Sequence, residues 1–309
     1  MSETIYGKFE EIRAFCHTHC SESELWPTYY DRRFQEFLTY FEFFPRERYP
    51  KVLELGCGIG YNSAFLSKIS DQVVATDLEE ENPSSHSPGL RKTRKFLAKL
   101  NITNVNVMNA SAIDLPFADN SFDMVFSSFV LEHVPNLNKA ILEINRVLKP
   151  GGHNICIVPT STDAVYSFFF YYMYLVKRTF VKIGELVYSK SASAGGIEAS
   201  KAVSSESKST FFTYFPFPPP HGVLPNYLSE LRYWRAENWR KKITAAYSIR
   251  LVLQRNLQLN PLLPLSGVFF PGFGTKLYAA SRKAENRLSQ YSLFKILGIS
   301  SLLITEKCK

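Results

Sequence analysis

The sequence predicts a doubly wound α/β fold, in which helices cover both faces of a mostly parallel sheet. Between residues 51 and 159, short apolar runs typical of strands alternate with segments whose apolar residues recur at helical spacing. Gly56, Gly58 and Gly60 form a turn after the first run, and Pro150 marks the end of the last helix because proline cannot continue it. The expected strands lie near 51–55, 72–77, 104–108, 122–128 and 152–159, and the expected helices near 60–70, 88–100 and 137–148.

The glycine turn and the residue that ends the next strand indicate a cofactor site. Glycine permits positive φ and lets a ligand approach the backbone without meeting a Cβ atom, and the helix that follows opens with unpaired N–H groups. The second strand ends at Asp77, whose carboxylate can accept both hydroxyls of a ribose. The glycines follow a GxGxG spacing rather than the GxGxxG spacing of dinucleotide sites, so no dedicated pyrophosphate cradle is expected.

Four segments in order resemble the successive motifs of class I S-adenosylmethionine-dependent methyltransferases: ELGCGIG at 54–60, TDLEE at 76–80, NASAIDLPFADNSFDMVFSSFVLEHV at 109–134 and RVLKPGG at 146–152. Within that class, the closest resemblance is to the domain of the ubiquinone and menaquinone C-methyltransferases and their small-molecule relatives. It implies a Rossmann-like sheet of seven strands with N-terminal helices and an insertion after strand 5. It also implies S-adenosyl-L-methionine as the cofactor and S-adenosyl-L-homocysteine as the product.

The same resemblance implies roles for the residues of the cofactor site. The turn glycines would pass against the amino-acid moiety and the ribose, Glu54 would order the ammonium group, and Asp77 would bind the ribose hydroxyls. Relatives commonly carry an acidic side chain before the LPF element, where this chain has Ser111 and Ala112, so the adenine contact departs from the family pattern. The full set of expected cofactor-binding residues is Glu54, Gly56, Cys57, Gly58, Gly60, Asp77, Leu78, Ser111, Ala112 and Ser128.

Three histidines, His133, His153 and His221, are candidates for the catalytic base that an alcohol or enol acceptor needs, and His133 and His221 are the two we select. His133 follows the fourth strand, and His221 closes the insertion in the sequence PPPHG. Because relatives of varied chemistry share the first histidine, a structural hydrogen bond is the favoured role for His133 and catalysis the other. The segment CHTHC at 16–20 contains metal-ligating residue types, but it has no second ligand pair of the kind that zinc sites use, so no metal is expected.

Outside the cofactor-binding core of residues 51–160, the sequence predicts further segments. Residues 1–50 are expected to form a helical cap that carries Tyr29 and Tyr30. An aromatic-rich insertion is expected at 161–225, disordered in its Ser-, Ala- and Lys-rich part at 189–210. The last elements of the unit 226–283 are expected to be a helix at 226–245 capped by Asn226 and closing strands at 248–259 and 276–283, followed by an amphipathic tail at 284–309.

Charge is unevenly distributed along the chain. Residues 1–160 hold 16 Lys and Arg against 20 Asp and Glu, whereas residues 161–309 hold 20 Lys and Arg against 8 Asp and Glu, and this basic second half favours anionic partners.

The aromatic block at 164–176 is too short to span a bilayer and is followed by basic residues. It therefore indicates either a buried lid over the substrate or contact with an anionic membrane surface, and the apolar pattern of the tail slightly favours the membrane. The five cysteines and the polar N-terminus show no secretory pattern, so a cytoplasmic protein, peripheral at the membrane face, is expected.

We therefore expect a methyltransferase that acts on the oxygen or carbon of a small, hydrophobic or lipid-linked acceptor. One alternative is an RNA or protein methyltransferase, which the basic second half favours. Ser128 stands where such enzymes carry an asparagine clamp for an amino group, and the aromatic residues are not interleaved with Arg and Lys, so the sequence argues against a nucleic-acid partner. The other alternative is a non-catalytic membrane-interaction protein built on the same fold.

Overall fold

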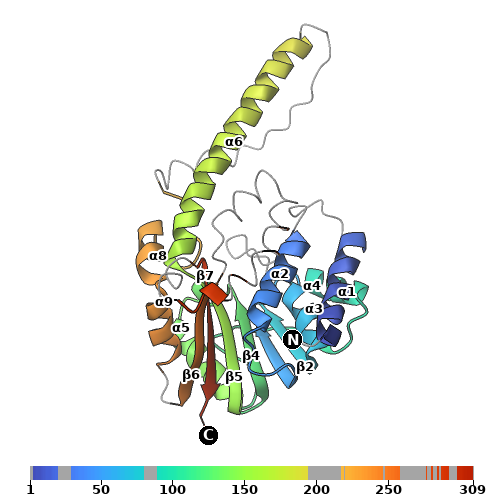
Figure 1. The fold of residues 1–309 in the computed structure, drawn as a ribbon, viewed down its shortest axis with the longest axis vertical. Coiled ribbons are helices and arrows are strands. Elements are labelled where there is room, and N and C mark those ends of the chain that lie inside the picture. Colours follow the sequence, from blue (N-terminus) through green and yellow to red (C-terminus); the bar gives the residue numbers. More distant parts are fainter. Residues whose placement is uncertain are drawn as a thin grey trace.

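The computed structural model describes residues 3–19, 29–79, 89–193, 217–218, 220–245, 248–257 and 298–308, together with 276, 280, 284 and 287–291. These residues form a seven-stranded sheet with helices on both faces (Figure 1), which confirms the predicted fold class. The strands follow the order β3-β2-β1-β4-β5-β7-β6 across the sheet. Their bounds are β1 Tyr49–Leu55, β2 Ser70–Asp77, β3 Val105–Asn109, β4 Phe122–Ser128, β5 Leu148–Pro159, β6 Ile249–Leu257 and β7 Ser300–Lys307.

The first five strands are parallel, and β7 runs antiparallel to both β5 and β6. The carboxyl ends of parallel strands meet at one edge of a sheet, which is where ligands bind in open α/β folds. Leu55 of β1 pairs with Thr76 of β2 on one side and with Ser127 of β4 on the other. The chain segments that follow these three residues therefore lie side by side.

Two apolar layers hold the helices against the sheet. One layer joins the sheet to the N-terminal helices and those between β1 and β3, and the other joins it to helices nearer the C-terminus. The helices of the first layer are α1 Glu3–His19, α2 Tyr29–Phe41, α3 Tyr61–Lys68 and α4 Leu90–Lys99. Those of the second are α5 Leu137–Val147, α8 Tyr227–Tyr233 and α9 Ala236–Ile243, seen on the opposite side in Figure 1.

Aromatic rings fasten the N-terminal helices to the core. Phe37 of α2 stacks on Phe65 of α3 with ring centroids 4.8 Å apart. Phe9 of α1 meets both rings edge-on, at 5.3 and 5.4 Å. The predicted helices before the sheet are thus present. Tyr29 and Tyr30 begin α2, but their side chains lie outside the described part of the chain.

The last strand is not where the sequence predicts it. The closing strand expected at 276–283 is wrong, because Lys276 and Ala280 are helical and β7 lies within the expected amphipathic tail. β5 and β6 pair with the two edges of β7, and the consecutive residues Leu302, Leu303 and Ile304, which point to alternate faces of the sheet, are fully buried, so β7 is covered on both faces. A strand buried on both faces forms a continuous apolar run, which periodicity alone does not distinguish from a buried helix.

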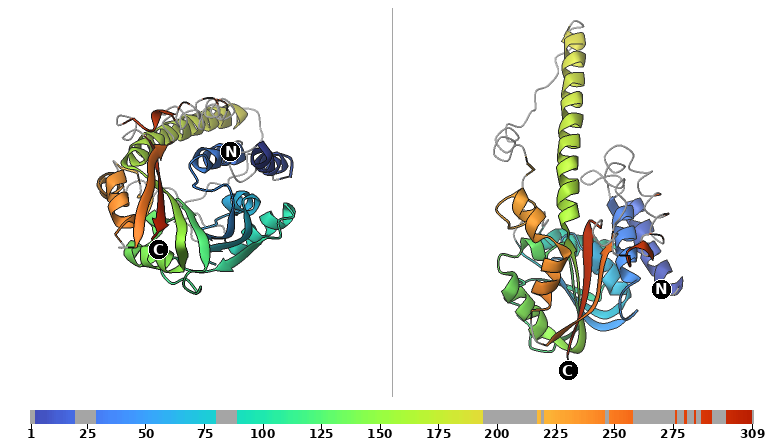
Figure 2. Two further views of the ribbon diagram at one scale, coloured as in Figure 1. Left: turned by 60° about the horizontal axis from the view of Figure 1, so that its bottom comes forward. Right: turned by 60° about the vertical axis from the view of Figure 1, so that its left-hand side comes forward.

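The insertion after β5 begins with one long helix, α6 Ser161–Ser193, of 33 residues. It projects away from the sheet in Figure 1 and in the right-hand view of Figure 2, and it contains the whole aromatic block. The expected disorder does not begin at residue 189, because 189–193 still belong to α6, and residues 194–210 lie outside the described part. Among the helices described, none combines the length and the apolar character needed to cross a bilayer.

The helix expected at 226–245 is divided into α8 and α9. Asn226 caps α8 as predicted, and its side chain accepts a hydrogen bond from the N–H of Ser229 at 2.9 Å. The chain then leaves the helix at Trp234, whose side chain is buried and whose carbonyl accepts the N–H of Ser161 at 3.0 Å. Trp234 thus packs into the second apolar layer at the break between the two helices.

Candidate active site

The glycine turn after β1 has a backbone conformation that residues other than glycine rarely adopt. Gly56, Gly58 and Gly60 have φ angles of 67°, 52° and 90°. A Cβ atom on Gly56 would lie 2.3 Å from Cγ2 of Val130, and one on Gly60 would lie 2.9 Å from Cγ2 of Thr93. A Cβ atom on Gly58 would meet nothing within 4 Å. The turn is therefore packed against the protein at its two ends and open in the middle.

Asp77 joins the end of β2 to this turn. Its carboxylate accepts hydrogen bonds from the backbone N–H groups of Gly58 and Leu78, both at 2.8 Å. Each oxygen keeps a second lone pair for a ligand, and the residue is only half-buried. The N–H of Ala110 donates to the Asp77 carbonyl at 3.2 Å, which brings the segment after β3 to the same place. A ribose lying against Gly58 would therefore meet this carboxylate.

Glu54, near the end of β1, is a buried acid close to the turn. It is 1% exposed, and the hydroxyl of Ser63 in α3 donates a hydrogen bond to it. Burial raises the pKa of Glu54 to about 8, a shift that the Ser63 hydrogen bond opposes and the charge of Asp77 increases. The carboxyl group is therefore mostly protonated at pH 7, and a cation bound beside it would favour its ionised form.

The other predicted cofactor residues lie along the same edge of the sheet. Cys57 is buried within the turn, and Ser128 ends β4 next to it. Leu78 is 48% exposed. Ser111 and Ala112 follow β3, close to the segment that hydrogen-bonds to Asp77. The structure thus brings the predicted set together, and the role of each residue toward a cofactor remains a prediction.

The two predicted histidines meet beyond the carboxyl end of β4. His133 ends the short 3-10 turn η2 Leu131–His133, His221 precedes α8, and their ring centroids are 5.2 Å apart. Glu132 completes the group, since the ligand atoms of Glu132, His133 and His221 all lie within 4.8 Å of one another. His133 is half-buried and His221 is exposed, so the group is open to solvent on one side.

Sequence analysis missed Glu132 as a member of this group. The residue is 3% exposed, and neither carboxylate oxygen has a hydrogen-bond partner within the described residues. Burial raises the pKa of Glu132 to about 8, and the negative charges of Asp163 and Glu230 add to the shift. The sequence shows only an acid next to a histidine, and its burial depends on a segment that comes much later in the chain.

That segment, residues 221–223, is here called the strap. The N–H of Val223 donates to the carbonyl of Glu132 at 3.1 Å, and a Cβ atom on Gly222 would lie 2.5 Å from the same oxygen. From the other side, the buried carboxylate of Glu230 in α8 accepts the first two N–H groups of the strap. Backbone hydrogen bonds therefore hold the strap over η2.

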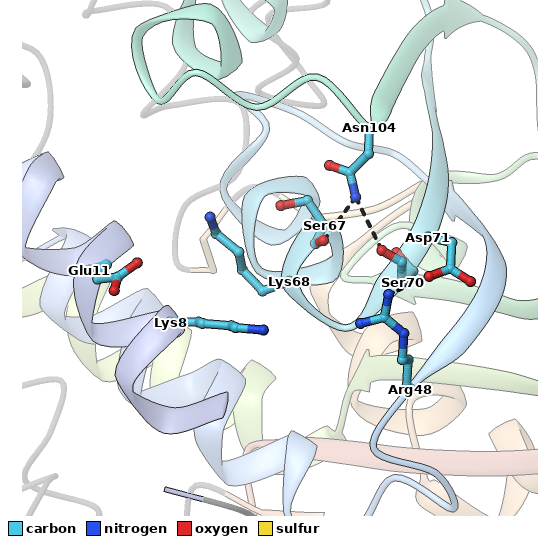
Figure 3. Close-up of a pocket in the computed structure, with 8 residues that line it drawn as sticks. All are labelled: Lys8, Glu11, Arg48, Ser67, Lys68, Ser70, Asp71 and Asn104. Atoms are coloured by element: carbon cyan, nitrogen blue, oxygen red, sulfur yellow. Dashed lines mark hydrogen bonds and ion pairs between the residues drawn. The ribbon is translucent and has the colours of Figure 1, made fainter. Parts of the chain in front are cut away.

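A separate surface pocket of about 500 Å³ lies at the opposite edge of the sheet (Figure 3). Ser70 and Asp71 begin β2 and Arg48 precedes β1, so the pocket lies at the amino ends of the strands. Arg48 and Asp71 form an ion pair in it. None of the predicted site residues lines it, and the predicted site remains at the carboxyl edge.

Comparison with known proteins agrees with this arrangement. Residues 53–156 match the methyltransferase domain family. The demethylmenaquinone methyltransferase of Staphylococcus carnosus is 32% identical over 144 residues, which cover 44% of this chain and 56% of that protein. The ubiquinone/menaquinone biosynthesis C-methyltransferase UbiE of Haemophilus ducreyi is 41% identical over 102 residues, covering 33% of this chain and 38% of that protein. The chain thus spans between 38% and 56% of the length of these relatives.

A solved structure extends the likeness over the whole fold. It is the complex between the Haloferax volcanii Trm112 methyltransferase activator and a proposed methyltransferase, with a TM-score of 0.50, 17% identity, and coverage of 97% of this chain and 98% of that chain. At this identity the likeness concerns the fold. Residues 53–156 are thus similar in sequence to the methyltransferase domain family, and they belong to a Rossmann-like sheet whose fold is shared with that solved structure.

Proposed function

We propose that the protein transfers a methyl group from S-adenosyl-L-methionine to a small acceptor. The observation that carries the proposal is the Asp77 carboxylate, which is hydrogen-bonded to the Gly58 N–H beside an open glycine turn. Adenosine has a ribose that suits this carboxylate, and the backbone at Gly58 leaves room for it. The methyltransferase domain match and the names of the curated relatives support the same chemistry.

The residues of the site orient the cofactor and the acceptor rather than take part in breaking bonds. S-adenosyl-L-methionine carries an electrophilic methyl group when bound, and much of the rate of an in-line displacement comes from aligning the acceptor and excluding water. The turn and Asp77 would hold the adenosine, and Glu54 would face the ammonium group. Val130 packs on Gly56 and leads directly into η2, so an acceptor bound over η2 would lie next to the cofactor. His133 and His221 lie there and stay the predicted bases.

We infer that the acceptor is hydrophobic or lipid-linked, for example a quinone-type ring. The names of the curated relatives refer to demethylmenaquinone and to ubiquinone and menaquinone biosynthesis. Between α6 and α8, Phe168, Phe217 and Tyr227 pack together, with ring centroids 5.4 Å apart for Phe217 and Tyr227 and 5.9 Å apart for Phe168 and Tyr227. Aromatic side chains of this kind suit a flat apolar ligand.

The experiment that tests this function compares extracts of cells with and without the protein by mass spectrometry. We expect a lipid-soluble compound that is heavier by one methylene unit only when the protein is present. Methylation found in RNA or protein instead would favour the alternative substrate class. Calorimetric titration of the purified protein with S-adenosyl-L-methionine tests the other alternative, because a non-catalytic membrane protein on this fold need not bind it.

Binding of the cofactor should become tighter as the pH rises toward 8. Burial raises the pKa of Glu54 to about 8 in the free protein, and the ammonium group of the cofactor would lower it, so binding should release a proton below that pH. Glu54→Gln should remove both the release and the pH dependence that Glu54 causes. Titrations in buffers with different ionisation enthalpies measure the number of protons released.

The same variant separates cofactor binding from folding. Because the folded pKa of Glu54 lies above its ordinary value of 4.5, its contribution to stability is complete below that value and is lost as pH rises through about 8. Glutamine cannot ionise and its oxygen can still accept the Ser63 hydrogen bond, so Glu54→Gln should fold and exceed the wild type in stability above pH 8. Glu306→Gln, at a half-buried residue of β7 that pairs with Arg250 away from the turn, serves as a control. An unchanged proton release in Glu54→Gln would exclude the ammonium contact.

We also propose that α6 contacts an anionic membrane surface. The helix projects from the sheet (Figure 1), and Phe169, Phe180 and Ile183 are 60%, 70% and 51% exposed. Basic residues occur at 177, 178 and 182 of the same helix. A helix that carries both exposed apolar rings and basic residues suits the head-group region of a membrane, where rings enter the apolar boundary and cations meet phosphates.

Substitution of both Phe169 and Phe180 by serine should weaken binding to vesicles that contain anionic lipid by about tenfold or more, since each ring removes apolar area from water when it inserts. Flotation of the protein with such vesicles measures the binding. Leu142→Ser is the matched control, because Leu142 is 61% exposed but lies on α5. If the wild-type protein stays in the aqueous fraction, α6 acts as a lid instead.

A further inference from the structure

The group over η2 has the composition of a metal centre. Glu132 and His133 are adjacent in η2, whereas His221 comes from the strap, and their ligand atoms lie within 4.8 Å of one another. Nε2 of His133 and Oε1 of Glu132 are 3.9 Å apart, which is too long for a hydrogen bond. Zinc sites in proteins commonly take neighbouring ligands from one turn and the remainder from a distant element.

Glu132 supplies an independent sign of a ligand. Its carboxylate is buried, points into the group with the two histidines, and accepts no hydrogen bond from any other described residue. Burial of a carboxyl group without a partner is costly. The charged groups that act on it, Asp163 and Glu230, are also acidic. The surroundings of Glu132 therefore attract a cation.

We propose that Glu132, His133 and His221 bind a divalent transition-metal ion, and that zinc is the ion this donor set fits best. Two imidazole nitrogens and one carboxylate oxygen are the protein ligands of one class of catalytic zinc site, in which a fourth position stays open. The solvent-exposed side of the group, where His221 lies, leaves room for that fourth ligand.

The three ligand side chains could move closer together around a bound ion. Ligand atoms bonded to one tetrahedral zinc ion lie ~3.3 Å apart, so ligand atoms now separated by up to 4.8 Å must approach one another by up to about 1.5 Å. The backbone need not move, because Glu230 and the carbonyl of Glu132 hold the strap on both sides. The exposed imidazole of His221 can supply the movement by rotation of its side chain.

The proposed binding of a metal ion does not depend on the proposed methyl transfer. A role for the ion in catalysis, by contrast, rests on that proposed function. Val130 contacts the Gly56 turn and immediately precedes η2, so the ion would lie beside the cofactor site. An acceptor oxygen at the open position would have its pKa lowered by the ion, which favours the ionised oxygen of an alcohol or enol. The two histidines would then act as metal ligands rather than as free bases.

The test titrates the full-length protein, freed of metal with a chelator and without S-adenosyl-L-methionine, with Zn²⁺ by calorimetry and with Co²⁺ by absorption spectroscopy. The wild type should bind one equivalent and show a visible Co²⁺ spectrum. His221→Ala and Glu132→Gln should each weaken binding by more than about 100-fold. The matched control is His153→Gln, a buried histidine in β5 outside the group, which should bind like the wild type.

The thermal unfolding temperature of each variant, with and without Zn²⁺, shows whether Glu132 and His221 bind the ion or only stabilise the fold. His221 is exposed, and glutamine at 132 has nearly the shape of glutamate, so both variants should unfold near the wild-type temperature without metal and should lose the rise that Zn²⁺ causes. Wild-type affinity in either variant, or no binding by the wild type, would overturn the proposal. An intense cobalt–thiolate band would also overturn it, because the ion would then be bound by cysteine, which the proposed group does not contain. Because the titration contains no S-adenosyl-L-methionine, an absence of metal binding would not contradict the proposed cofactor site.

Discussion

Replacement of Asp77 by alanine should lower the affinity for S-adenosyl-L-methionine by about 100-fold or more while the protein stays folded. A carboxylate that accepts two ribose hydroxyls makes two charge-assisted hydrogen bonds, each worth about 1.5–3 kcal/mol, and every 1.4 kcal/mol is a factor of ten in affinity. The variant also loses the acceptor of the Gly58 N–H, at a cost in stability of about 1 kcal/mol. Calorimetric titration measures the affinity, and thermal unfolding measures the stability.

Asp71→Ala is the matched control for this prediction. Asp71 lies near the start of the same strand, where it is exposed and forms an ion pair with Arg48. An exposed ion pair contributes about 0–1 kcal/mol, so this variant should lose little stability and no affinity. If Asp77→Ala binds the cofactor as tightly as the wild type, the proposed cofactor site is wrong. An equal loss in both variants would show that the effect is not specific to the turn.

Gly56→Ala should destabilise the protein by about 3 kcal/mol, measured by urea unfolding. A non-glycine residue at a φ of 67° costs about 1–2 kcal/mol, and the overlap of its Cβ with Val130 at 2.3 Å adds an overpacking cost of about 1–3 kcal/mol. Gly58→Ala has a similar φ of 52°, but its Cβ meets nothing within 4 Å, so it should cost only about 1–2 kcal/mol. The difference between the two variants isolates the steric contact.

Val130→Ala provides the check on that interpretation. Removal of the two methyl groups takes away the atoms that the new Cβ would meet, so the double variant Gly56→Ala, Val130→Ala should be less destabilised than the sum of the two single variants. Additive free energies of unfolding would mean that Val130 is not the obstacle. The contact matters for function because Val130 connects the glycine turn to η2, which carries Glu132 and His133.

The parallel part of the fold could be predicted closely from the sequence. The strand expected at 122–128 is β4 Phe122–Ser128, and the strand expected at 104–108 is β3 Val105–Asn109. These apolar runs are short and bounded by turn residues, so local patterns identify them. β5 begins at Leu148 rather than 152 because Leu148 pairs with Phe122 before an irregularity in the ladder. No local pattern indicates a pairing that depends on another strand.

The antiparallel end of the sheet was predicted less well, and the reason is pairing at long range. Residues 276–283 and 300–307 both contain apolar residues that suit a strand, but only the second segment lies between β5 and β6. Its fit depends on partners on both sides, such as Ile155 of β5 and Leu253 of β6, which both pair with Ile304. Such a choice between segments is a property of the assembled sheet.

The sequence by itself determined the cofactor side of the site, because the glycine turn and Asp77 come from neighbouring parallel strands whose carboxyl ends must meet at one edge. Only the tertiary structure decided the other side. The strap seats His221 beside His133 and buries Glu132, and it does so through backbone hydrogen bonds to η2 and to Glu230. The bond to η2 joins two backbone groups, and the bonds to the Glu230 carboxylate form only because α8 brings this side chain back to the strap, so residue patterns do not reveal them.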